Sequence, residues 1–125
     1  MEKVEQKNTK DHLIEAIIEG ARRKKGLKIL NLDLTKLNNT ECSHFIICHG
    51  TSNTQVEAIA HSIEETVEEI TGEDVWHTDG YKNAQWILLD YAEIMVHVFH
   101  VEWRKHYDLE QLWADAEFIN YNSEN

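Results

Sequence analysis

Positive charge is scarce in this sequence. Its 125 residues include 12 Lys and Arg against 23 Asp and Glu, which gives a formal net charge of −11. A surface of this sign repels phosphates, so direct, sequence-specific binding to nucleic acid is disfavoured and a basic protein is the favoured partner. The basic run 22–25 is interpreted as the end of a helix, where cations complement the helix dipole.

A secretory signal is also lacking, and no apolar run reaches membrane-spanning length. The two cysteines, Cys42 and Cys48, do not have the spacing of a metal site or of a redox motif. Cys48 lies in an apolar run, where a buried free thiol is expected. These features predict a cytoplasmic protein in a compartment where thiols stay reduced.

The length suits one domain, and the order of the expected elements predicts an α/β or α+β fold with a mixed sheet. We expect a polar leader at 1–8, a domain at 9–115 and a tail at 116–125. Apolar residues at helical spacing predict a first helix that starts at Thr9 and ends at Gly26. A short helical stretch is expected at 102–106, followed by a second capping pattern at 108–111. About five strands are predicted, at 27–32, 45–48, 75–78, 85–91 and 94–99, with the apolar segment 45–48 at the centre of the sheet.

A second long helix is predicted after Ser52, whose spacing from Gln55 fits a capping box, and Gly72 ends it. No Lys or Arg occurs between Asn53 and Tyr81, so the outer side of this helix is acidic, most simply as a solvated surface. The expected buried stripe consists of Val56, Ile59, Ala60, Ile63, Val67 and Ile70. The outer glutamates are Glu57, Glu64, Glu65, Glu68 and Glu69.

The two longest predicted strands pair naturally through a two-residue turn at Ala92-Glu93. Because strand side chains alternate between faces, one face then forms a core surface made of Ile87, Leu89, Tyr91, Ile94, Val96 and Val98. The opposite face, called here the mixed face, consists of Trp86, Leu88, Asp90, Met95, His97 and Phe99. Large apolar groups beside a carboxylate and an imidazole are typical of a protein interface with aromatic anchors, but cover by a terminal helix explains the face equally well.

The sequence supports a catalytic function less well than it supports protein binding. The turn 50–52 has the residues to hold phosphates, but magnesium-dependent nucleotidyl transfer also needs two or three converging carboxylates. Glu73 and Asp74 are adjacent and point apart, and Asp90 alone does not hold a metal ion. A divergent nucleotidyltransferase therefore stays the alternative.

Metal or nucleophilic sites based on histidine are no better supported. His97 and His100 face opposite sides of a strand, and neither His106 nor the pair Cys42 and His44 has matching ligands for zinc. A nucleophilic Cys–His pair stays open, although nothing in the sequence identifies an orienting third group. We expect no cofactor and no metal.

Several segments resemble the bacterial ribosomal silencing factor (Iojap) family. They are 45–56 with Ile59-Ala60, 86–91, 94–99 and 107–113, and the resemblance covers about residues 10–114. His49 stands where the family usually has a small polar residue, and Ala92 replaces a common glycine.

The resemblance implies a nucleotidyltransferase-like fold without transferase activity. It also implies binding to ribosomal protein fourteen of the large subunit, on the face that meets the small subunit, so that subunit joining is obstructed and translation falls when nutrients are scarce. The family interface falls on the mixed face, centred on Trp86 with Tyr107 beside it. We further expect the acidic helix to project into the space that small-subunit RNA must enter, and the protein to be a monomer or a homodimer.

Overall fold

The computed structural model describes the backbone of residues 3–37 and 42–121, and side chains from residue 9 onward. Its sheet is mixed: β2 and β5 are parallel, and the other neighbours are antiparallel. The strand order is β3-β4-β5-β2-β1-β6. The elements are α1 (Lys3–Arg23), β1 (Leu27–Asp33), β2 (His44–Gly50), α2 (Asn53–Thr71), β3 (His77–Asp79), β4 (Trp86–Asp90), β5 (Ile94–His100), α3 (Val101–Tyr107), α4 (Leu109–Leu112) and β6 (Glu117–Asn120).

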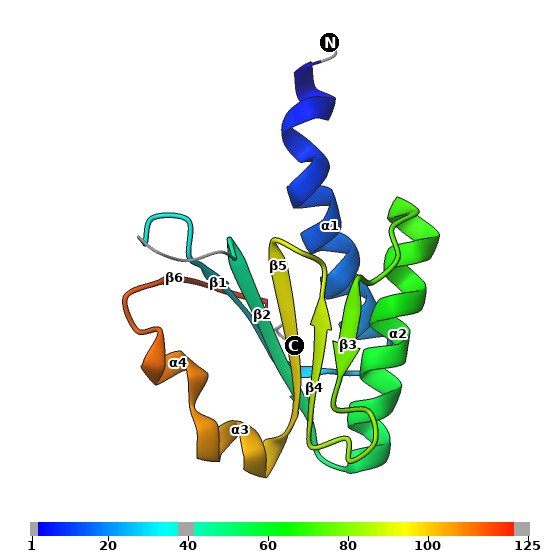
Figure 1. Ribbon diagram of the computed structural model, residues 1–125, viewed down its shortest axis with the longest axis vertical. Helices are drawn as coiled ribbons and strands as arrows, with labels where there is room; N and C mark the ends of the chain where they lie inside the picture. Colours follow the sequence, from blue (N-terminus) through cyan, green and yellow to red (C-terminus); the bar gives the residue numbers. More distant parts are fainter. Residues whose placement is uncertain (1–2, 38–41, 122–125) are drawn as a thin grey trace.

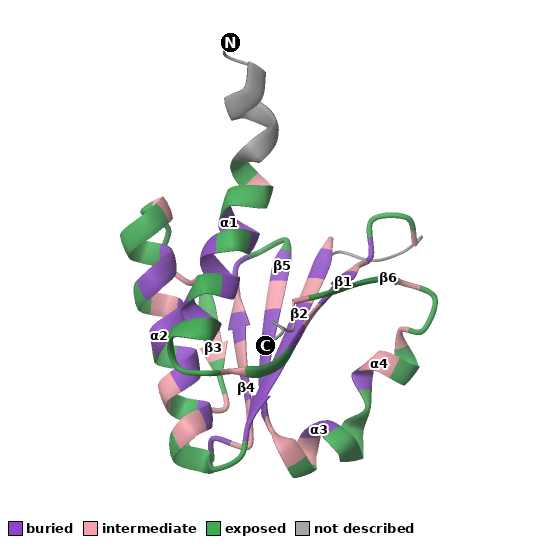
Figure 2. Ribbon diagram, turned by 180° about the vertical axis from the view of Figure 1, so that it is seen from behind, coloured by how far each residue is buried: buried purple, intermediate pink, exposed green. Residues whose placement is uncertain are grey.

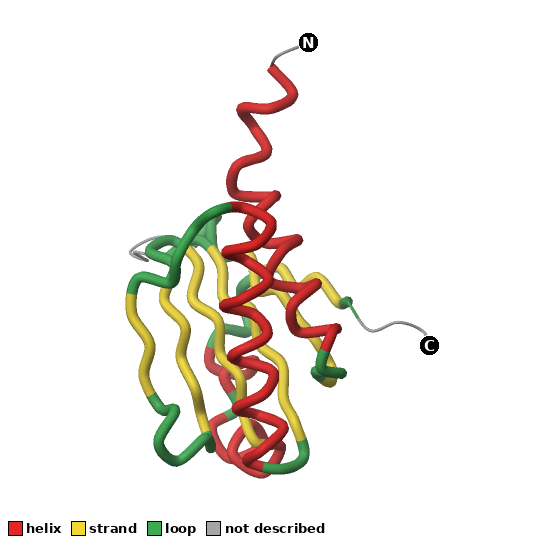
Figure 3. Tube along the Cα trace, turned by 90° about the vertical axis from the view of Figure 1, so that its right-hand side faces the viewer, coloured by secondary structure: helices red, strands yellow, loops and turns green. Residues whose placement is uncertain are grey.

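The long helices and the short ones lie on opposite sides of this sheet. Helices α1 and α2 pack together on one side, and α3 and α4 follow β5 across the other (Figures 1 and 3). A hydrophobic core lies on each side of the sheet. The buried residues are therefore found on the strands and on the helix surfaces that face the sheet (Figure 2). None of the helices within the described residues combines the length and the apolar character that crossing a membrane requires.

The predicted mixed α/β fold is confirmed, with two corrections at the ends of the chain. The sheet has six strands rather than about five, because residues 117–120, expected in the tail, form β6 along β1. Helix α1 begins at Lys3, so the expected leader is helical from that residue, whereas residues 1–2 and 122–125 lie outside the described part. The central position of β2, between β5 and β1, is as predicted.

The predicted hairpin register is confirmed pair by pair. Trp86 faces Phe99, Leu88 faces His97 and Asp90 faces Met95. Ala92 occupies the left-handed region with φ of 71°, and its N–H donates to Asp90 Oδ1 at 2.7 Å. This side-chain hydrogen bond stabilises the turn at a position where glycine could adopt the positive φ without strain.

Helix α2 has the predicted ends. Ser52 Oγ accepts from the Gln55 N–H at 3.1 Å, and Gly72 closes the helix with φ of 80°. The buried stripe is correct except for Ile70, which is 40% exposed because it lines the groove between the last turn of α2 and α1. Elsewhere the two helices touch closely: a Cβ on Gly20 would lie 2.6 Å from the Ile63 Cα, and Ser62 Oγ donates to the Gly20 carbonyl at 2.8 Å.

Candidate protein-binding face

The mixed face lies on the side of the sheet away from α1 and α2. The core-face residues of β4 and β5 are all buried beneath those helices, as predicted. On the mixed face, Trp86, Leu88, Asp90 and Met95 are half-buried. The sheet therefore brings together all six predicted residues of this face on two adjacent strands.

Part of this face is not available to a partner, which corrects the prediction for two residues. Phe99 is fully buried and His97 is 6% exposed. Phe99 belongs to a second core with Leu109 of α4, against which Trp103 and Trp113 pack. The terminal helices thus cover the half of the face that lies over β5, β2 and β1. Five predicted residues stay accessible: Trp86, Leu88, Asp90, Met95 and Tyr107, the last 43% exposed.

Trp86 is held in one orientation by its neighbours. Its indole packs on Phe99 and Tyr107, with ring centroids 4.9 and 4.8 Å apart. Its Nε1–H donates to His97 Nδ1 at 3.1 Å. The backbone is also fixed, because Gly80, at φ of 94°, lies so close to the Trp86 carbonyl that a Cβ would collide with it. A large aromatic side chain fixed in this way loses little further freedom on binding, which favours its use as an anchor.

Burial determines the protonation state of His97 and the hydrogen bonds that its ring can make. It lowers the pKa of His97 to about 4, so the ring is neutral near pH 7 and its Nδ1 can accept the indole hydrogen bond. The ring proton is therefore on Nε2, which has no hydrogen-bond partner among the described residues. We conclude that His97 positions Trp86 rather than contacting a partner.

A buried arginine that the sequence did not reveal ties down α3, the helix that carries Tyr107. Arg104 of α3 donates from Nη2 to Glu110 Oε2 at 2.8 Å and from Nη1 to the Lys28 carbonyl at 2.9 Å. Its Nη1 also lies 2.9 Å from His49 Nδ1, and burial together with this cation lowers the pKa of His49 to about 4. The network joins α3 to the irregular start of β1, where the pairing register shifts. In the sequence, this network is indicated only by the positions of Arg104 and Glu110, which lie on either side of Asp108, the N-cap of α4.

The accessible part of the mixed face continues onto the edge strand β3. In the β3–β4 register His77 faces Asp90 and Asp79 faces Leu88. Between Lys36 and Arg104 the sequence contains a single basic residue, Lys82. Strands β3, β4 and β5 therefore bring carboxylates but no Lys or Arg to this surface, which suits a basic protein partner.

Comparison with known proteins decides the family. Residues 6–125 match the family described as "Ribosomal silencing factor during starvation" (RsfS). This chain belongs to the RsfS family.

Individual relatives agree with this assignment. Ribosomal silencing factor RsfS of Bacillus subtilis is 41% identical over 93 residues, or 74% of this chain and 77% of the relative. RsfS of Halalkalibacterium halodurans is 36% identical over 104 residues, or 83% and 87%. A crystal structure of a Chromobacterium violaceum protein aligns with a TM-score of 0.78 at 33% identity, covering 83% of this chain and 85% of that one. A structure from Bacillus halodurans gives 0.74 at 32%, covering 89% and 99%. The resemblance noted in the sequence is confirmed.

The groups that catalysis would need are engaged otherwise in this RsfS chain. At the turn 50–52, the Thr51 N–H donates to Gln55 Oε1 at 2.8 Å, and Ser52 Oγ already accepts from the Gln55 N–H. Two amides that would cradle a phosphate are thus satisfied internally. Burial raises the pKa of Cys48 to about 12 and also raises that of Cys42, so neither thiol is activated as a nucleophile.

The candidate metal ligands also have other roles. His100 Nδ1 accepts from the Glu102 N–H at 3.2 Å and caps α3. Cys42 Sγ donates to the carbonyls of His44 and Glu93. Within the described ranges no cluster of three His, Cys, Asp or Glu side chains has a geometry that could hold a metal ion.

Proposed function

We propose that this protein binds the large ribosomal subunit through ribosomal protein fourteen and prevents the small subunit from joining. The accessible residues Trp86, Leu88, Asp90, Met95 and Tyr107 form the contact surface, and translation falls as a result. Membership of a family named for ribosome silencing supports the role. The observation that carries the choice of surface is the immobilised, half-buried Trp86 at its centre.

Charge supports a basic ribosomal protein as the direct partner. The chain has a formal net charge of −11, and Lys82 is the single cation between Lys36 and Arg104. Ribosomal RNA alone would be repelled by such a surface, whereas a basic protein would be attracted to it over a Debye length of about 8 Å. Asp90, whose Oδ1 accepts from the hairpin turn, meets a Lys or Arg of the partner.

Inhibition is then mainly steric. A folded domain bound where the subunits meet excludes the small subunit by its volume. Helix α2 lies on the other side of the sheet from the contact surface (Figures 1 and 3), so its exposed glutamates face away from the complex and add repulsion toward incoming RNA.

Purified ribosomal subunits provide the test. The protein should co-sediment with large subunits, and light scattering should show slower association of large and small subunits in its presence. The same preparation should show no magnesium-dependent rise in melting temperature with ATP or CTP, since a ligand that binds only the folded state must stabilise it. Absence of large-subunit binding would refute the proposal, and a saturable nucleotide effect would favour the nucleotidyltransferase alternative.

A further inference from the structure

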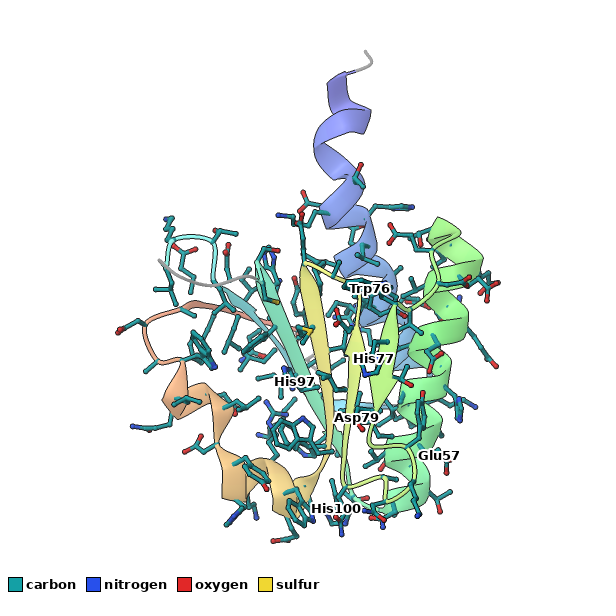
Figure 4. All side chains as sticks on the ribbon, viewed as in Figure 1. Glu57, Trp76, His77, Asp79, His97 and His100 are labelled. Atoms are coloured by element: carbon teal, nitrogen blue, oxygen red, sulfur yellow. The ribbon has the colours of Figure 1, made fainter. Side chains whose placement is uncertain are left out.

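An exposed tryptophan lies at the free edge of the sheet beside the contact surface. Trp76 directly precedes β3 and is 75% exposed, more than any other large apolar side chain among the described residues. β3 is the terminal strand in the sheet order, so no other strand within the described part of the chain pairs with its outer edge. Figure 4 shows Trp76, His77 and Asp79 in succession along this edge.

The local backbone turns Trp76 toward the mixed face. Val75 packs against the core beneath α1 and α2, and Thr78 faces the core residue Leu89. Between Val75 and Thr78, both Trp76 and His77 lie opposite the single residue Asp90. The Trp76 N–H donates to the Asp90 carbonyl at 2.9 Å, and His77 is the register partner of Asp90. Two residues opposite one is the pattern of a β-bulge, which re-aims side chains at a sheet edge. His77 points to the side that carries Asp90, and this pattern assigns Trp76 to the same side.

The bulge makes Trp76 continuous with the accessible part of the mixed face. Asp90 adjoins it on β4, and Asp79 lies further along β3 opposite Leu88. Trp86 lies four residues from Asp90 on the same strand, about 13 Å away at ~3.3 Å per residue. The surface thus has an aromatic side chain at each end and carboxylates between them.

We propose that Trp76 is a second anchor, whose indole face receives a Lys or Arg side chain of the basic partner that docks on Trp86. This inference rests on the proposed function. Cations are attracted to the face of an indole ring, and the carboxylate of Asp90 supplies the opposite charge beside it, with that of Asp79 further along β3. An apolar group placed there would bury those carboxylates without compensation. RNA phosphates would be repelled, and a second copy of the chain brings the same net charge of −11.

The test compares binding of variants to purified large subunits. Trp76→Ala should weaken binding about fivefold, within the range of a single cation–π contact. Asp79→Asn should weaken binding less and make it less sensitive to salt. Ile70→Ala, which removes a 40% exposed apolar group from the helix side, is the matched control and should bind as the wild type does. Trp76→Ala should keep the wild-type melting temperature, because the bond to Asp90 is made by the backbone.

Each outcome separates the second anchor from the proposed function. Wild-type affinity of Trp76→Ala together with weak binding by Trp86→Ala overturns the second anchor and leaves the proposed function intact. Wild-type affinity of both variants overturns both. If Trp76→Ala instead converts a dimer of the free protein to a monomer, or abolishes binding to protein-free large-subunit RNA, the occupant is a second copy or RNA and the inference is wrong.

Discussion

Trp86 is partly accessible and partly packed, because its indole contacts Phe99 and Tyr107 while the rest of the side chain is only half-buried. It lies on the side of the sheet away from α1 and α2, but Tyr107 of α3 packs beside it. Removal of Trp86 should cost stability as well as affinity, although less than the 3–5 kcal/mol typical of a fully buried tryptophan.

Trp86→Ala should accordingly weaken binding to large subunits by about 2 kcal/mol or more, the range of an interface hot spot, and lower the unfolding free energy by about 1–2 kcal/mol. Sedimentation at several protein concentrations measures the first effect, and urea unfolding measures the second. Leu112→Ala, on α4 and 71% exposed, is a control for loss of an exposed apolar group. A folded Trp86→Ala protein with wild-type affinity would remove this residue from the contact surface.

The buried histidines predict acid sensitivity. The pKa values of His97 and His49 are both lowered to about 4 from an ordinary value of 6.5. As pH falls below about 6.5 the unfolded chain takes up these protons while the folded protein does not, so unfolding free energy decreases until about pH 4. Each unit of pKa difference corresponds to about 1.4 kcal/mol.

Urea unfolding between pH 7.5 and 4.5 should therefore show a stability loss that starts near pH 6.5. His97→Gln should have a shallower pH dependence than the wild type over this interval, because one of the buried histidines with a lowered pKa is removed. A wild-type profile that is flat down to pH 5 would contradict this account.

Among the secondary-structure elements, those with the strongest alternation of apolar and polar residues were the most predictable from the sequence. The β4–β5 hairpin was predictable in register because a one-residue shift would bury Asp90 and expose core residues such as Ile87. Strand β6 was not predictable, since all four of its residues are exposed and it is defined only by pairing with β1. The cover of half the mixed face by α3 and α4 includes a contact of Arg104 with β1, between residues 76 positions apart, that no local pattern reveals.

Arg104 should therefore control the placement of the whole α3–α4 segment. Arg104→Met leaves the Glu110 carboxylate and two half-buried carbonyl groups without their cation, and removal of one partner of a buried ion pair costs about 3–5 kcal/mol. We expect a loss near the lower end, about 3 kcal/mol, because Glu110 is partly exposed.

Hydrogen exchange should locate the effect of this substitution. Faster exchange is expected in 101–113, with less change in α1 and α2, whose packing Arg104 does not share. Lys105→Met, an exposed neighbour on the same helix, is the matched control. Unchanged exchange in 101–113 of the Arg104→Met protein would show that the apolar contacts of Leu109 and Phe99 hold the segment unaided.

For the molecule as a whole, the sheet separates two surfaces of different character. One side carries the mixed face, and the other carries the acidic helix α2 (Figures 1 and 3). The five outer glutamates of α2 are not equivalent, however. Tyr81 Oη donates to Glu64 at 2.6 Å, and Arg23 pairs with Glu69 at 3.0 Å. Repulsion toward RNA should therefore come mainly from the exposed carboxylates of Glu57, Glu65 and Glu68.

A triple variant with glutamine at positions 57, 65 and 68 isolates this charge from the volume of the domain. It should bind large subunits as tightly as the wild type does, because these residues lie on the opposite side of the sheet from Trp86. It should inhibit subunit association somewhat less at low salt, and the difference should shrink as salt rises, because exposed charges are screened beyond about 8 Å at physiological ionic strength. Steric exclusion should remain the larger effect, since a folded domain at the subunit interface blocks the partner whatever its charge.

Light scattering at two salt concentrations measures this difference. A second triple variant, Asp11→Asn, Glu15→Gln and Asp115→Asn, changes net charge equally at exposed positions outside α2 and serves as the control. If the two triple variants inhibit equally, net charge matters and the position of the acidic helix does not. If the α2 variant inhibits as strongly as the wild type at low salt, electrostatic repulsion is excluded and inhibition is steric alone.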